Sequence, residues 1–132
     1  MKIIEVLNAL IPLRALSEVR FTSFKKSREL AILRKKVEFE AEFYTKEEKK
    51  IVDLYALKNE QGEPEILEGG RIKLKDIESK NKFDVEITKL RELEIEDIDK
   101  VTLSEKDFSD SSNLPTPSEL IALESVIDFK ED

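Results

Sequence analysis

The chain has 132 residues and a formal net charge of −7 at pH 7, and 40 % of its residues are charged while 39 % are hydrophobic. Cysteine and histidine are both absent, which excludes disulfide frameworks, thiolate metal sites and Ser-His or Cys-His catalysis. Three glycines leave neither a phosphate-binding loop nor a dinucleotide fingerprint. We therefore predict a single domain over residues 1–132 that is not an enzyme and binds no metal or cofactor.

The distribution of charged and apolar residues along the chain limits the kinds of partner that we expect the protein to bind. Residues 1–58 contain 13 basic and 9 acidic residues, whereas residues 59–132 contain 10 basic and 21 acidic residues. We expect the two halves to fold against each other, and the alternative is an acidic surface offered to a basic partner. No apolar run approaches the roughly 18 residues of a membrane span, and a signal-peptide pattern is missing, so we expect a cytoplasmic protein without membrane contact.

Residues 1–19 are apolar on more than one side, which predicts a helix buried on most faces. Pro12 lacks a backbone donor and is expected to kink or interrupt this helix. An alternative stays open, in which residues 1–5 form a short strand and the helix begins only near Val6.

Residues 23–57 are the predicted central helix, with Thr22 or Ser23 as its N-cap. One face is apolar at helical spacing, with Arg34 and Glu48 as polar interruptions, and it carries Leu30, Val37, Ala41, Tyr44, Ile51 and Tyr55. At about 1.5 Å per residue the helix is roughly 50 Å long, which is too long for one compact core to cover. Basic residues crowd its first turns, but the acidic chain as a whole argues against direct nucleic-acid binding.

The same helix has a second apolar stripe, made of Ile32, Phe39 and Phe43. It lies about 200 to 240° around the helix from Val37. Two apolar faces require two packing partners. The pattern favours burial of the second stripe within the chain, for example under a small hairpin, and the alternative is a second subunit, so the three residues are a candidate interaction face.

Residues 58–64 are polar, contain Gly and Pro, and end the central helix. A β-hairpin is predicted next, with its turn at residues 68–70 between an apolar pair at 66–67 and Ile72 with Leu74. A further helix is expected from Asp76, as an antiparallel partner of the central helix, and its heptad-spaced apolar residues are Phe83, Ile87 and Leu90.

Residues 93–103 alternate between apolar and acidic side chains, which predicts a strand with a bulge at residues 97–98. The acidic residues around it form a candidate acidic surface: Glu92, Glu94, Glu96, Asp97 and Asp99. Such carboxylates can bind Mg²⁺ or Ca²⁺, but one strand face supplies a row instead of converging ligands, so a solvated face is favoured.

Residues 104–115 are acidic and Ser-rich and predict a flexible loop. Thr116 and Glu119 form a capping box with Pro117 at the first helical position, so a helix begins there. This helix is expected to bury Leu120, Leu123 and Ile127 and to end in a charged tail at residues 128–132. The predicted fold is thus mainly α (α+β), with a long central helix, two or three shorter helices, a small β-hairpin and one further strand.

Several ordered motifs together resemble an uncharacterised family of small phage and prophage proteins. They are Leu7-Asn8-Ala9-Leu10, the long charged helix ending in Leu54-Tyr55-Ala56, the Lys58–Gly62 turn, the Gly69-Gly70 hairpin, Phe83 with Ile87 and Leu90, Glu94-Ile95-Glu96 and the 117–124 run. The resemblance implies an accessory protein in a bacterial host and no catalytic residue.

Two functions remain. The first is a non-enzymatic accessory or assembly protein that acts through protein–protein contacts and associates with itself, because its long helix has two apolar stripes. The second is an acidic inhibitor that occupies the basic nucleic-acid groove of a host enzyme, because residues 59–132 are strongly acidic.

Overall fold

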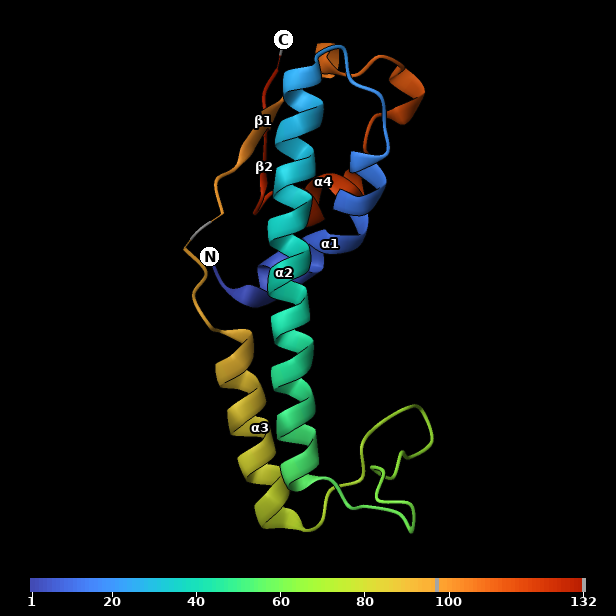
Figure 1. Cartoon of the computed structure of the whole chain (residues 1–132), viewed down its shortest axis with the longest axis vertical. Coiled ribbons are helices and arrows are strands. Elements are labelled where there is room, and N and C mark those ends of the chain that lie inside the picture. The colour runs from blue at the N-terminus through green and yellow to red at the C-terminus, as the bar shows by residue number, and fades with distance from the viewer. Residues whose placement is uncertain (97, 132) are drawn as a thin grey trace. The chain divides into compact units, whose positions relative to one another are not determined.

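The computed structural model describes residues 1–96 and 98–131 (Figure 1). In that part of the chain the elements follow in the order α1 (Ile3–Ser17), α2 (Phe24–Tyr55), α3 (Ile77–Arg91), β1 (Val101–Leu103), two 3-10 helices (Glu105–Asp107 and Ser111–Asn113), α4 (Pro117–Leu123) and β2 (Ile127–Phe129). A long helix with shorter helices and a small sheet confirms the predicted mainly helical class. The chain divides into a first unit, Met1–Glu42 with Glu94–Asp132, and a second unit, Phe43–Leu93.

In the first unit, α1 buries a single stripe at helical spacing, formed by Ile3, Val6, Ala9, Leu13 and Leu16. Its other side is open, since Ile11 is 77 % exposed. Burial on most faces is therefore a wrong prediction. The helix includes Ile3 and continues through Pro12, so neither a strand at residues 1–5 nor an interruption is found. Packing of the buried stripe outweighs the cost of about 3 kcal/mol that a helix-interior proline carries.

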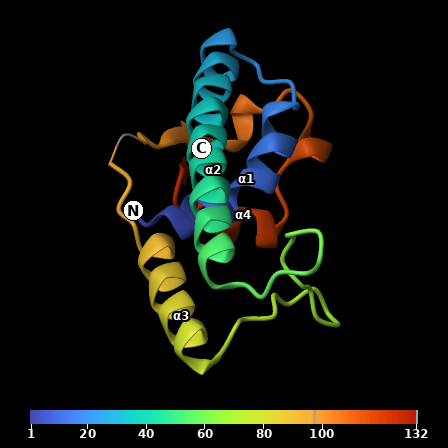
Figure 2. The same cartoon turned by 60° about the horizontal axis from the view of Figure 1, so that its bottom comes forward.

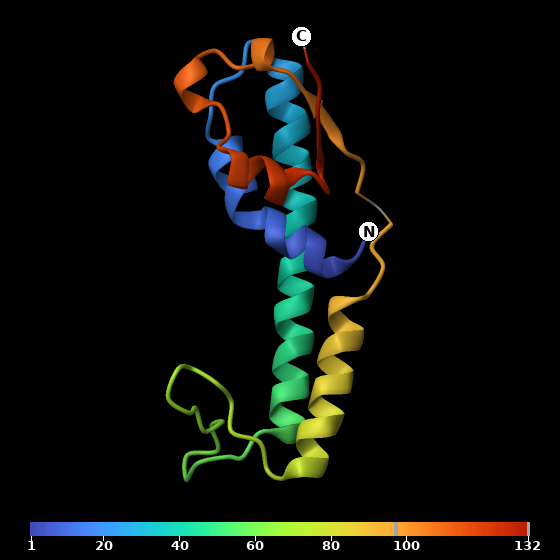
Figure 3. The ribbon, with the colours of Figure 1, turned by 180° about the vertical axis from the view of Figure 1, so that it is seen from behind.

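The capping box at α4 is present as predicted. Glu119 N donates to Thr116 Oγ1 at 3.3 Å, and Thr116 N donates to Glu119 Oε1 at 3.0 Å. The helix lies beside α1 (Figure 3). Of the residues expected in its buried face, Leu123 is fully buried, but Leu120 is 37 % exposed and Ile127 belongs to β2. The helix ends too early to carry Ile127.

Strands β1 and β2 pair in parallel, with Val101 opposite Ile127 and Leu103 opposite Phe129. Parallel strands need a long crossover, and the segment with α4 supplies it. The strand predicted over residues 93–103 is shortened to β1, and the bulge predicted at 97–98 includes Asp97, which lies outside the described residues.

The Ser-rich segment is tied to the connection between α1 and α2. Phe108 is buried, and its ring lies 5.0 Å from that of Phe21 between centroids. Thr22 N donates to Asp107 O at 2.8 Å. At the following helix start, Lys25 N donates to Ser23 Oγ at 3.1 Å, so Ser23 is the N-cap of α2.

The second unit pairs the last turns of α2 with α3 (Figure 2). Asp76 caps α3, because Ser79 N donates to its Oδ1 at 2.7 Å. Electrostatic interactions also link the two helices: the Tyr44 hydroxyl raises the pKa of Arg91, and burial together with the Glu86 carboxylate raises the pKa of Tyr55. The antiparallel helix pair predicted from the apolar spacing is therefore present.

Between these helices the predicted hairpin is present as antiparallel bridges instead of continuous strands. Ile66 pairs with Ile72, and Ala56 pairs with Leu74. Gly70 has a φ of 81° in the turn, a left-handed conformation that favours glycine.

Candidate interaction surface

The second apolar stripe of α2 lies open to solvent. Ile32 is 39 % exposed, Phe39 is 67 % exposed and Phe43 is 39 % exposed. Burial of these side chains within the chain is therefore a wrong prediction. The hairpin that was expected to cover them belongs, with Phe43, to the second unit, whereas Ile32 and Phe39 belong to the first. The stripe keeps its status as a candidate surface for a partner.

In the first unit, Ile32 and Phe39 border two adjoining hollows between α2 and residues 98–102. Lys36 lines both hollows, so the apolar side chains are flanked by a positive charge. Lys26 closes one end, where its Nζ donates to Thr102 O at 2.6 Å. A lysine on the carbonyl of a short strand limits the pairing of a further strand at that edge.

Of the candidate acidic residues, Glu92, Glu94, Glu96 and Asp99 lie outside the two strands. Glu92 is the C-cap of α3, Glu94 forms an isolated antiparallel bridge with Lys2, and β1 begins only at Val101. Glu94 Oε2 forms an ion pair with the Met1 ammonium group at 3.2 Å. Glu96 and Asp99 are exposed, and Asp97 lies outside the described residues. Within residues 1–96 and 98–131, no group of acidic side chains is arranged to hold a metal ion.

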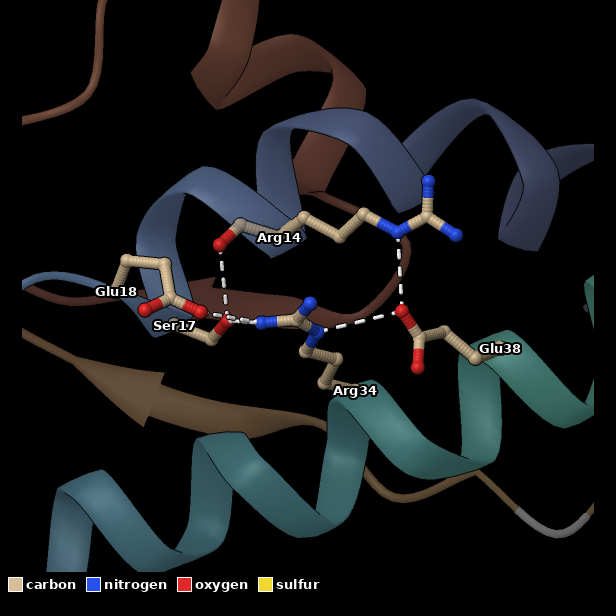
Figure 4. A network of polar contacts seen from close by, with 5 residues as sticks. All are labelled: Arg14, Ser17, Glu18, Arg34 and Glu38. Carbon is tan, nitrogen blue, oxygen red and sulfur yellow. Dashed lines mark hydrogen bonds and ion pairs between the residues drawn. The ribbon is translucent and has the colours of Figure 1, made fainter.

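A polar network joins α1 and α2 at a place the sequence did not single out (Figure 4). Arg34 Nη1 donates to Ser17 Oγ at 2.8 Å and to Glu18 Oε1 at 2.7 Å. Arg34 Nε and Arg14 Nε both donate to Glu38 Oε1, at 3.3 Å and 3.0 Å. The signal in the sequence was Arg34 itself, which interrupts an apolar face and needs carboxylate partners there.

The network shifts the pKa values of Arg34 and Glu38 further from neutral pH. The Glu18 and Glu38 carboxylates raise the pKa of Arg34, and hydrogen bonds from Arg14 and Arg34 lower the pKa of Glu38. A general acid or base needs a pKa near the working pH. These pKa shifts therefore favour a structural role for the network, as a connection between the two helices, over proton transfer.

The second unit buries few of its own apolar side chains. Across Phe43–Leu93 the buried hydrophobic residues are Tyr44, Ala56 and Ile87. The exposed large hydrophobic residues of the same unit are Phe43, Leu54, Ile66, Leu67, Ile77, Val85 and Leu93. Two helices alone cover only part of each other's apolar surface, so this unit has faces left for a partner.

A protein-family model matches almost the whole chain. A model described as a protein of unknown function, DUF1617, matches residues 3–128. The chain belongs to the DUF1617 family. This confirms the resemblance to an uncharacterised family at that level. No curated protein and no solved structure matches this family member.

The helices of this DUF1617 protein do not have the character of membrane spans in the part of the chain that the structure describes. None of those in residues 1–96 and 98–131 combines the length and the apolar composition that a bilayer crossing requires. The exposed apolar residues of α2 are interrupted by charges, which is the pattern of a surface helix.

Proposed function

We propose that this DUF1617 member is a non-enzymatic accessory or assembly protein of phage or prophage type, acting in the bacterial cytoplasm through protein–protein contacts and self-association. The observation that carries the proposal is the exposed apolar stripe of α2, with Phe39 at 67 % exposure. Water-exposed aromatic side chains on a rigid helix are typical of interfaces. The phage setting rests on the resemblance given by the motifs that run from Leu7-Asn8-Ala9-Leu10 to the 117–124 segment.

The charged groups support a binding role over a reaction. Hydrogen bonds to the charged form raise the pKa of Lys82 and of Arg91 and lower the pKa of Asp76 and of Asp110. All of them move away from neutrality, where an acid or base catalyst operates.

Light scattering coupled to gel filtration tests the self-association. At tens of micromolar we expect the wild type to elute as a dimer or a larger assembly. Phe43→Ala removes an exposed ring from α2 and should shift the protein toward monomer, whereas Ile77→Ala removes a still more exposed side chain from α3 and should not. A wild-type protein that is monomeric under these conditions contradicts the proposal.

An inhibitor of a nucleic-acid enzyme is the second candidate. Residues 94–132 contain 12 acidic and 3 basic residues. Among the described ones, most carboxylates are exposed, including Glu96, Asp99 and Glu105. In this case binding to a host nuclease or polymerase weakens steeply as salt rises, because phosphate-like charge contacts are screened. Binding that is insensitive to salt rules this mechanism out.

A further inference from the structure

One face of α2 within the second unit carries two apolar residues on either side of two opposite charges: Phe43, Glu47, Lys50 and Leu54. Their spacings of four, three and four residues place them within about 60° of one another around the helix. The face is open, since Leu54 is 60 % exposed and the Lys50 side chain is 71 % exposed. Tyr44 and Ile87, which are buried in the helix pair, mark a different side.

These four residues form a nearly symmetric pattern along the helix: apolar, charged, charged, apolar, with the two charges of opposite sign. Apolar residues stand at the ends, Phe43 and Leu54, and opposite charges stand inside, Glu47 and Lys50. A two-fold interface requires that when residue i meets residue j, residue j also meets residue i. Two antiparallel copies of this face satisfy that condition, because Phe43 meets Leu54 and Glu47 meets Lys50 at both ends.

We propose that a second copy of this chain docks on this face of α2, antiparallel, with the two-fold axis between Glu47 and Lys50. The inference rests on the self-association in the proposed function and adds the face and the register. Parallel packing would instead place Glu47 on Glu47 and Lys50 on Lys50, and like charges at a contact are unfavourable.

Charge around the face also suits a second copy. Lys46 and Asp53 flank it on one side, and antiparallel packing brings Lys46 of one copy toward Asp53 of the other. The second unit as a whole contains 11 basic and 12 acidic residues, so two such units meet with little net repulsion. Within one chain Lys50 Nζ lies 2.9 Å from Glu47 Oε1, which holds both charged groups at the centre of the face.

The area of the proposed interface determines how tightly the two copies are expected to bind. Three helical turns from each copy cover less than the roughly 1,200 to 2,000 Å² of a standard stable interface. We therefore expect a dimer that dissociates in the micromolar range, and one that is sensitive to changes of single side chains.

Charge reversal tests the register. Glu47→Lys places lysine opposite Lys50 of the other copy, and Lys50→Glu places glutamate opposite Glu47, so each variant alone should dissociate about tenfold more readily. An equimolar mixture of the two variants restores opposite charges at both contacts and should form a heterodimer close to wild-type strength. The mixture cannot repair any effect inside a single chain, so its rescue separates an interface role from a folding role.

A matched control comes from α3. Glu78 and Lys82 form an exposed ion pair of the same kind, with Oε1 and Nζ at 3.2 Å. Glu78→Lys should leave the dimer dissociation constant unchanged. Circular dichroism of every variant verifies that the helices are retained.

Cross-linking provides a second and independent readout, because the chain contains no cysteine. A mixture of Phe43→Cys and Leu54→Cys chains should form a disulfide-linked heterodimer on mild oxidation. Either variant alone should not, since identical positions in an antiparallel pair lie about 16 Å apart along the axis.

The outcomes distinguish the two levels of the proposal. A monomeric wild type overturns the self-association itself. A wild-type dimer whose charge-reversed variants show no preference for each other, and whose cysteine variants do not cross-link when mixed, overturns only the face and register proposed for α2.

Discussion

Arg34 on α2 and Glu18 at the end of α1 are 16 residues apart in the sequence, and their side chains meet with Nη1 and Oε1 2.7 Å apart. The same guanidinium reaches Ser17 and Glu38, so one side chain connects the end of α1 with the middle of the long helix. Guanidinium groups suit such bridging because their donors point in several fixed directions.

Arg34→Ala should destabilise the first unit more than removal of a freely exposed arginine. The change leaves Glu18 and Glu38 without their shared donor on a face that also packs apolar residues. Urea unfolding followed by circular dichroism measures the loss as a lower midpoint. Arg28→Ala, on an exposed position of the same helix, is the matched control and should leave the midpoint close to that of the wild type.

Glu38→Gln should reveal a pH-dependent contribution to stability. Because Arg14 and Arg34 lower the pKa of Glu38 below its ordinary value of 4.5, the ionised carboxylate stabilises the folded state above that pH. The stability difference between wild type and Glu38→Gln is therefore largest at neutral pH and disappears as the pH falls through the lowered pKa.

Unfolding curves of both proteins over an acid-to-neutral series measure this difference. In a background of Arg14→Gln and Arg34→Gln, the same substitution should lose most of its pH dependence, because the donors that shift the carboxylate are gone. A difference that persists unchanged in this background contradicts the assigned cause.

Thr116→Ala should cost about 1 kcal/mol of unfolding free energy, because the side chain accepts from Glu119 N at the start of α4. Ser118→Ala changes a neighbouring exposed hydroxyl in the same turn and should have less effect. Chemical denaturation compares the two directly, and equal losses would count against the capping role.

Leu123→Ala should destabilise the protein by about 2 to 5 kcal/mol, because the side chain is fully buried where α4 lies against α1. Ile121→Ala, two residues earlier, removes a side chain that is 69 % exposed and should cost less than about 0.5 kcal/mol. The pair of thermal unfolding midpoints verifies which face of this short helix is the core face.

Much of the helical layout was predictable because its signals are local. The capping box at Thr116 and the cap at Asp76 each depend on a hydrogen bond to a backbone group three residues away. The long helix was predictable because its apolar spacing persists over many turns. The network around Arg34 was missed because its partners on α1 lie at no fixed sequence spacing from it.

The sequence by itself determined the start of α4, the turn glycines and the existence of two apolar stripes on α2, since these follow from backbone geometry and short-range spacing. Only the tertiary structure decided that Ile127 pairs in a parallel strand with Val101, that Pro12 stays within α1, and that Phe39 faces solvent. Each of these depends on which segments meet in space. The free energy of such long-range packing is absent from any short stretch of the chain.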